Sequence, residues 1–285
     1  MEVELLVHNQ TQLGEGPVWD HRTSILYWVD IEQGHIQAYD HQSRINQVYP
    51  MGEFVGAAVP TIDGRLIVGL KSKVIIFDPS TGAQELVCEP EPGEHSNRFN
   101  DGKCDRRGRF WIGSTQVDHK DPTGALYAIE PGGTFSPKLK HLTISNGMAW
   151  SADDRMMYFI DSPTMAVQRF HYQSLTGEIE PLDEVVRFTS DAGVPDGMTI
   201  DNQGNLWIAF YGAGRVGCYH PTSGQQLISI SVPAKNTTSC CFGGPAMDEL
   251  FITTARRDDP TGGGLYRCKP GVSGPRAQFF KYKDR

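Results

Sequence analysis

The chain has 285 residues, of which 39% are hydrophobic, 10% aromatic and 21% charged, and its formal net charge is −8. Apolar segments recur along its whole length, which excludes an intrinsically disordered chain. No apolar run approaches the roughly 20 residues that a membrane-spanning helix requires, and the negative charge argues against a protein that neutralises nucleic-acid phosphates. The opening Met1-Glu2-Val3-Glu4 lacks the basic and apolar regions of a secretory signal. We therefore expect a cytoplasmic protein with no nucleic-acid or membrane partner.

The cysteine and histidine spacings exclude the common sulfur and imidazole metal sites. Six cysteines are present, but no C-x-x-C pair occurs, and no H-E-x-x-H motif is found among the nine histidines. Without a secretory signal, reduced thiols are expected rather than three disulfides. Any metal ion in this protein should therefore be held by oxygen ligands.

A short apolar segment recurs six times in chain order, at intervals of about 40 to 50 residues. The copies are residues 26–29, 66–68, 110–112, 157–160, 206–208 and 250–252. Each follows a polar turn and precedes a second strand-like segment, as at 74–77 and 216–219, and no helical periodicity of any length appears. This pattern predicts an all-β, six-bladed β-propeller that forms a single domain over residues 1–285. A β-sandwich is the alternative, but it does not predict six equivalent units.

The N-terminal segment 4–7 resembles the outer strands expected at 85–87 and 185–188, yet no blade precedes it. We expect it to complete the last blade, beside Phe251 and Tyr266, because pairing the two chain ends within one blade leaves no open sheet edge. The C-terminal Gln278-Phe279-Phe280 is a rival for the same edge.

The first strand of each propeller blade lines the central channel, so equivalent positions in successive blades face one another. At one such position the six repeats carry Glu15, Gly56, Asn100, Asn146, Asp196 and Ser239. A single Asn-Gly or Asp-Gly pair is usually a turn, but four oxygen-bearing side chains at one repeat position predict a cage for one divalent cation at the channel mouth. Ca²⁺ is the expected ion, with Mg²⁺, Mn²⁺, Zn²⁺ and Fe²⁺ as alternatives.

Five segments in chain order resemble the signature segments of the regucalcin/gluconolactonase family of the senescence marker protein type. They are Leu13-Gly14-Glu15-Gly16-Pro17-Val18-Trp19, Asn97-Arg98-Phe99-Asn100-Asp101-Gly102-Lys103, Ser145-Asn146-Gly147-Met148-Ala149-Trp150, Pro195-Asp196-Gly197-Met198 and Thr238-Ser239-Cys240-Cys241-Phe242-Gly243-Gly244. The resemblance covers essentially the whole chain, and the family fold is a six-bladed propeller.

The resemblance implies a metal-dependent lactonase that hydrolyses gluconolactone-type aldonolactones to aldonic acids. Carried over by residue, it makes Glu15, Asn146 and Asp196 the metal ligands, with Asp196 also the general base. It places Arg98 and Asn100 on the substrate, with Asn100 as a fourth ligand or holding substrate and water. The loop 115–121 should cover the site. The expected partner is a small-molecule sugar lactone, and the protein should be a monomer or a weak homo-oligomer.

Two other functions use the same residues. A metal-dependent organophosphate or phosphotriester hydrolase could bind its substrate in the same cage, because a cation polarises P=O as well as C=O. A non-catalytic calcium-binding propeller would hold the ion for structure alone. A serine hydrolase is not supported, because no Gly-x-Ser-x-Gly elbow is present.

Overall fold

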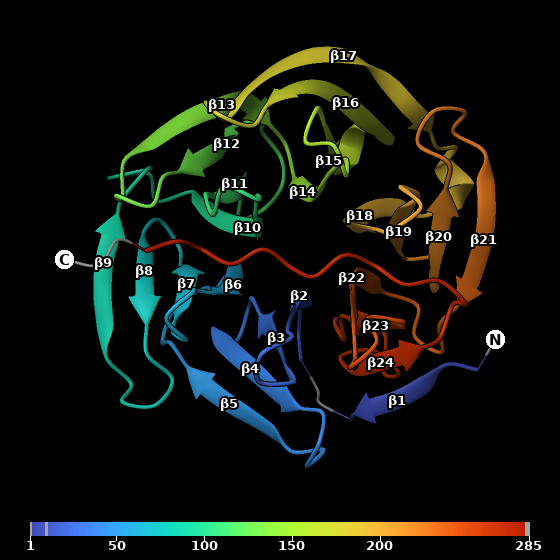
Figure 1. The fold of residues 1–285 in the computed structure, drawn as a ribbon, viewed down its shortest axis with the longest axis horizontal. Coiled ribbons are helices and arrows are strands. Elements are labelled where there is room, and N and C mark those ends of the chain that lie inside the picture. The colour runs from blue at the N-terminus through green and yellow to red at the C-terminus, as the bar shows by residue number, and fades with distance from the viewer. Residues whose placement is uncertain (1, 9–10, 283–285) are drawn as a thin grey trace.

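The computed structural model describes residues 2–8 and 11–282. It contains six four-stranded antiparallel sheets, arranged in chain order around a central axis (Figure 1). The described residues include no α-helix, only two single-turn 3₁₀ helices, η1 (Ser162–Thr164) and η2 (Ser190–Ala192). Neither is long or apolar enough to cross a bilayer. The predicted all-β, six-bladed propeller is confirmed.

Five blades are formed by consecutive strands, numbered from the channel outward. The first contains β2 (Gly14–Asp20), β3 (Ile25–Asp30), β4 (His35–Asp40) and β5 (Asn46–Pro50). The second contains β6 (Ala57–Pro60), β7 (Leu66–Gly69), β8 (Val74–Phe77) and β9 (Gln84–Cys88). The third contains β10 (Asn97–Cys104), β11 (Phe110–Gln116), β12 (Gly124–Ile129) and β13 (Phe135–Leu142).

The fourth blade contains β14 (Ser145–Trp150), β15 (Met156–Asp161), β16 (Ala166–Gln173) and β17 (Glu178–Arg187). The fifth contains β18 (Val194–Ile200), β19 (Leu206–Tyr211), β20 (Arg215–Tyr219) and β21 (Gln226–Ser231). The sixth contains β22 (Thr237–Gly243), β23 (Glu249–Thr254), β24 (Leu265–Cys268) and, as its outer strand, β1 (Glu4–Val7).

The predicted closure of the ring is confirmed by the pairing of the N-terminal strand. β1 runs antiparallel to β24, with Leu5 opposite Tyr266. The sixth sheet therefore contains both the first and the last strands of the chain, and its outer edge is occupied by β1 rather than by the C-terminal residues.

The six repeated apolar segments lie on the second strand of each blade. That strand is buried on both faces because neighbouring blades pack against it, so a continuous apolar run is favoured over alternation. β7, for example, is buried along its whole length, whereas the outer strand β9 alternates between exposed and less exposed residues. The apolar periodicity of this sequence therefore marks the blade interiors.

The last described segment, residues 270–282, leaves β24 and crosses one face of the ring to the second blade; we call it the C-terminal strap (Figure 1). The main chain of the strap bonds to several blades on its way. Gly274 N–H donates to Met247 O (2.9 Å), Phe280 N–H to Pro60 O (3.0 Å) and Lys281 N–H to Gly108 O (3.1 Å). The strap thus joins blades that lie on opposite sides of the channel.

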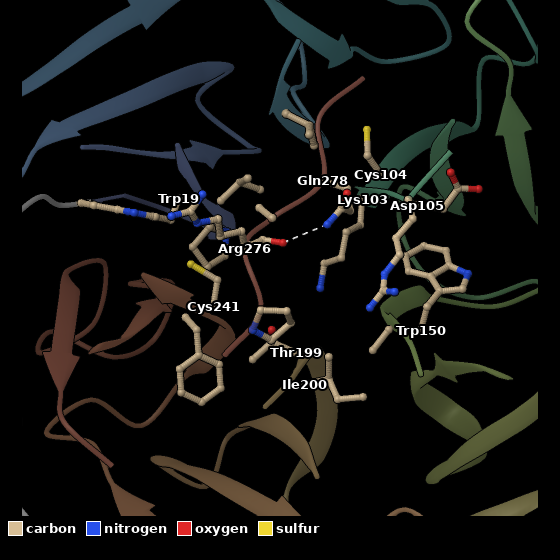
Figure 2. Close-up of a pocket in the computed structure, with 18 residues that line it drawn as sticks. Trp19, Lys103, Cys104, Asp105, Trp150, Thr199, Ile200, Cys241, Arg276 and Gln278 are labelled. Carbon is tan, nitrogen blue, oxygen red and sulfur yellow. Dashed lines mark hydrogen bonds between the residues drawn. The ribbon is translucent and has the colours of Figure 1, made fainter. Parts of the chain in front are cut away.

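Beneath the strap lies a cavity of about 100 Å³, lined by the second halves of the inner strands (Figure 2). Lys103 crosses this end of the channel, where its ammonium group donates to Met148 O (3.0 Å) and Met198 O (2.7 Å). Arg276 and Gln278 of the strap form part of the cavity wall. This end is therefore covered, and the predicted ligand residues lie on the first halves of the same strands.

Candidate metal and substrate site

A second cavity, of about 180 Å³, occupies the opposite end of the channel. All five residues predicted for the site line it, and all five are buried: Glu15, Arg98, Asn100, Asn146 and Asp196. They come from the inner strands of four different blades, β2, β10, β14 and β18. Four of them, Glu15, Asn100, Asn146 and Asp196, share the repeat position, and Arg98 was implied by the family resemblance.

A β-bulge accompanies each of these four positions. The regular pairing with the neighbouring strand is interrupted between Glu15 and Val18, Phe99 and Gly102, Ser145 and Met148, and Pro195 and Met198. A bulge adds an unpaired residue and re-aims nearby side chains. The Asn-Gly and Asp-Gly pairs, which singly resemble turns, are bulges within strands here.

Glu15 and Asp196 form a buried carboxyl pair joined by a hydrogen bond. Burial raises the pKa of both groups well above the usual range; the charge of Asp196 raises the pKa of Glu15 further, and that of Asp101 raises both. The shared hydrogen bond raises the pKa of Glu15 and lowers that of Asp196. Burial therefore favours the neutral forms of these carboxyl groups, and a nearby cation would favour the charged forms.

The amide of Asn146 is oriented by a chain of hydrogen bonds. Ser162 Oγ donates its hydrogen to Pro195 O (2.6 Å), so it accepts from Asn146 Nδ2 (2.9 Å). The Asn146 Oδ1 atom consequently faces the other way, where Asn100 Nδ2 donates to it (3.1 Å). This arrangement places the oxygen of the Asn146 amide, rather than its nitrogen, on the side of Asn100.

Gly56, at the equivalent position of the second blade, serves close packing. A Cβ atom there would lie 2.5 Å from the carbonyl carbon of Phe99 and 2.8 Å from Asn100 N. A side chain at this position would therefore displace β10, the strand that carries Arg98 and Asn100. At this position the second blade allows the close approach of β10, whereas four other blades contribute oxygen-bearing side chains to the cavity.

The donor set fits a hard divalent cation. Among the described residues, no three His, Cys, Asp or Glu side chains lie together as a metal-binding group. A cation in this cavity would instead be held by the carboxylates of Glu15 and Asp196 together with the carboxamide of Asn146. Asp196 Oδ1 is buried and makes no hydrogen bond in the described structure. A buried oxygen without a partner is costly, and a cation would satisfy this atom and relieve the repulsion between the carboxylates.

Arg98 is a buried guanidinium without a carboxylate partner among the described residues. Its Nη1 donates to Phe99 O (3.0 Å) and Asn100 Oδ1 (2.7 Å), which leaves the Nε and Nη2 hydrogens on the cavity wall. Burial is the main cause that lowers the pKa of Arg98, and the positive charge of Arg257 lowers it further, to about 10. The guanidinium therefore remains charged at neutral pH. It can therefore donate to a polar ligand in the cavity.

Four further polar residues belong to the site and were not predicted individually. His119 from the loop after β11, Tyr211 and Arg257 line the cavity, and Asp101 lies close enough to raise the pKa of the carboxyl pair. Arg257 is held by Glu32 at 2.6 Å. The sequence signal for Asp101 was its place in the Asn-Asp-Gly segment. Tyr211 is the last residue of β19, and His119 and Arg257 lie on loops, so none of these three occupies the repeat position.

Comparison with known proteins agrees with this architecture. The family model described as the SMP-30/Gluconolactonase/LRE-like region matches residues 13–256. A Bacillus subtilis protein named "Putative sugar lactone lactonase YvrE" is 34% identical over 96% of this chain and 97% of its own length. A luciferin-regenerating enzyme superposes with a TM-score of 0.92, at 31% identity, over 98% of this chain and 99% of its own.

The calcium-binding protein regucalcin from Agrobacterium tumefaciens superposes with a TM-score of 0.91, at 25% identity, over 97% of this chain and 96% of its own. Together with the whole-chain sequence matches, this places the propeller in a known group. The chain belongs to the SMP-30/gluconolactonase/LRE-like family.

Proposed function

We propose that this protein is a metal-dependent sugar lactonase that hydrolyses gluconolactone-type aldonolactones to aldonic acids. The observation that carries the proposal is the buried, unpartnered Asp196 Oδ1 beside Glu15 in an open cavity. A lactonase name among the whole-chain relatives supports it, and the calcium-binding regucalcin supports Ca²⁺ as the ion.

Glu15, Asn146 and Asp196 would hold the cation. Such an ion supplies Lewis-acid polarisation of the lactone carbonyl when bound. The residues of the chain supply the rest of the chemistry. Asp196 accepts a proton from the attacking water as the water oxygen bonds to the carbonyl carbon, and the proton then goes to the ring oxygen as the C–O bond breaks. The Nε and Nη2 donors of Arg98 hold a substrate oxygen, and Asn100 fixes the amide of Asn146.

The decisive experiment is Asp196→Asn, assayed for acid release from a panel of aldonolactones, with the metal content measured on the same sample. Asparagine keeps an oxygen for the metal but cannot accept the proton, so kcat should fall by roughly 10²–10⁴-fold. Normal turnover at full metal content would exclude Asp196 as the base. Wild-type protein that binds calcium but hydrolyses no lactone, with or without chelator, would exclude the lactonase.

A further inference from the structure

The loop that follows β11 brings His119 to the wall of the substrate cavity. Its geometry is held by its own hydrogen bonds: Gln116 Oε1 accepts from the main-chain N–H of Lys120 (3.1 Å) and of Asp121 (2.9 Å). His119 N–H donates to Gln116 O (3.1 Å), and His119 has the left-handed φ of 56°. The position of the imidazole is thus set by the fold before any ligand binds.

The hydrogen bonds of Thr115 determine which ring nitrogen of His119 carries the hydrogen. The Thr115 hydroxyl has one hydrogen, which it donates to main-chain carbonyl oxygens: Thr143 O lies 2.7 Å and Gln116 O 3.2 Å from Thr115 Oγ1. Thr115 Oγ1 also lies 3.0 Å from His119 Nδ1. Because its hydrogen is already used, the threonine oxygen must accept, so Nδ1 carries the hydrogen and Nε2 of the neutral ring has a free lone pair.

The ring stays neutral at physiological pH. Burial is the largest cause that lowers the pKa of His119, and the positive charges of Arg98 and Arg257 lower it further, to about 4. Nε2 makes no hydrogen bond to any residue in the described part of the chain. His119 Nε2 is therefore an acceptor on the part of the cavity wall that also carries the guanidinium groups of Arg98 and Arg257.

We propose that His119 is a specificity-determining residue that accepts a hydrogen bond through Nε2 from a hydroxyl group of the lactone. This inference rests on the proposed lactonase function, and it identifies a hydroxyl group as the part of the substrate that the loop recognises. A hydroxyl can accept from a guanidinium and donate to an imidazole, whereas a carboxylate or an alkyl substituent cannot donate to Nε2. The site therefore selects polyhydroxylated lactones.

The test is a double-mutant-type cycle, in which a substrate hydroxyl and the His119 side chain are removed singly and together. Wild type and His119→Phe are assayed for kcat/KM on D-glucono-1,5-lactone and on analogues that each lack one hydroxyl. For the wild type, one analogue should lose about tenfold relative to the parent lactone. With His119→Phe the parent itself should lose about the same factor, and removal of that hydroxyl should then cost nothing further. His119→Gln, which retains an acceptor oxygen, should recover part of the loss.

Asp118→Asn is the matched control, because Asp118 lies in the same loop but is exposed, and its ion pair in the described structure is with Lys120. It should keep the wild-type pattern. An identical pattern of losses across the analogues in wild type and His119→Phe would overturn the inference while leaving the lactonase intact. Wild-type protein that hydrolyses no lactone in the panel would overturn both.

Discussion

The C-terminal strap offers a test of how the ring is held together, through two adjacent phenylalanines in different surroundings. Phe280 is fully buried and belongs to the same apolar cluster as Val59 and Phe110. Phe279 is only half-buried, stacking on His21 with ring centroids 5.1 Å apart and lying beneath the guanidinium of Arg22 at 4.1 Å. Replacing each by alanine removes the same atoms from different environments.

Phe280→Ala should lower the free energy of unfolding by about 3–5 kcal/mol, the cost of emptying a closed site of that size. The main-chain hydrogen bonds to Pro60 O and from Ile62 N–H (3.0 Å each) do not depend on the side chain, so they stay available to the variant. Phe279→Ala loses a half-buried stacking and cation–π contact, worth about 1 kcal/mol.

The assay is urea unfolding of wild type and both variants, with the fluorescence and circular dichroism transitions compared to verify a single step. Activity at the candidate site should be unchanged in folded Phe280→Ala, because the strap lies at the other end of the channel. Equal losses for the two variants, or a loss below about 1 kcal/mol for Phe280→Ala, would refute the view that the strap is anchored by the buried ring.

Three further predictions follow from packing and ionisation. Gly56→Ala should destabilise the protein by about 1–3 kcal/mol and lower lactone turnover, because the methyl group meets the main chain of Phe99 and Asn100; unchanged stability and turnover would contradict this. His119 has a lowered folded-state pKa, so its stabilising contribution is present above its unfolded pKa near 6.5 and is lost as the pH falls towards 4. His119→Gln should therefore reduce the loss of unfolding free energy between about pH 7 and pH 4.5 by about 1 kcal/mol, after discounting for its partial exposure; an unchanged pH profile would argue against the shift. Burial raises the pKa of all six cysteine thiols, which are Cys88, Cys104, Cys218, Cys240, Cys241 and Cys268. A disulfide-exchange reagent at about pH 8 should therefore label none of them in the native protein and all of them after unfolding. Rapid labelling of the native protein would contradict this prediction.

The sequence by itself determined the blade count and the place of the central residues. Each blade repeats one local pattern, and a ring of identical units places equivalent residues face to face. Glu15, Asn146 and Asp196 could therefore be brought to one cavity without coordinates. The pairing of β1 with β24 was predictable for a related reason, since an unpaired outer strand has one open edge to fill.

Only the tertiary structure decided what lies outside the repeat. Phe280 bonds to Pro60 and Ile62, more than two hundred residues away, and nothing in the local pattern of the tail indicates that partner. His119 and Arg257 reach the cavity from loops whose paths depend on side-chain hydrogen bonds and left-handed residues rather than on apolar periodicity. Gly56 has its role because a neighbouring strand approaches closely, and only the packed blades create that approach. Periodicity specifies which faces are buried, whereas contacts between loops and blades are set when the whole ring closes.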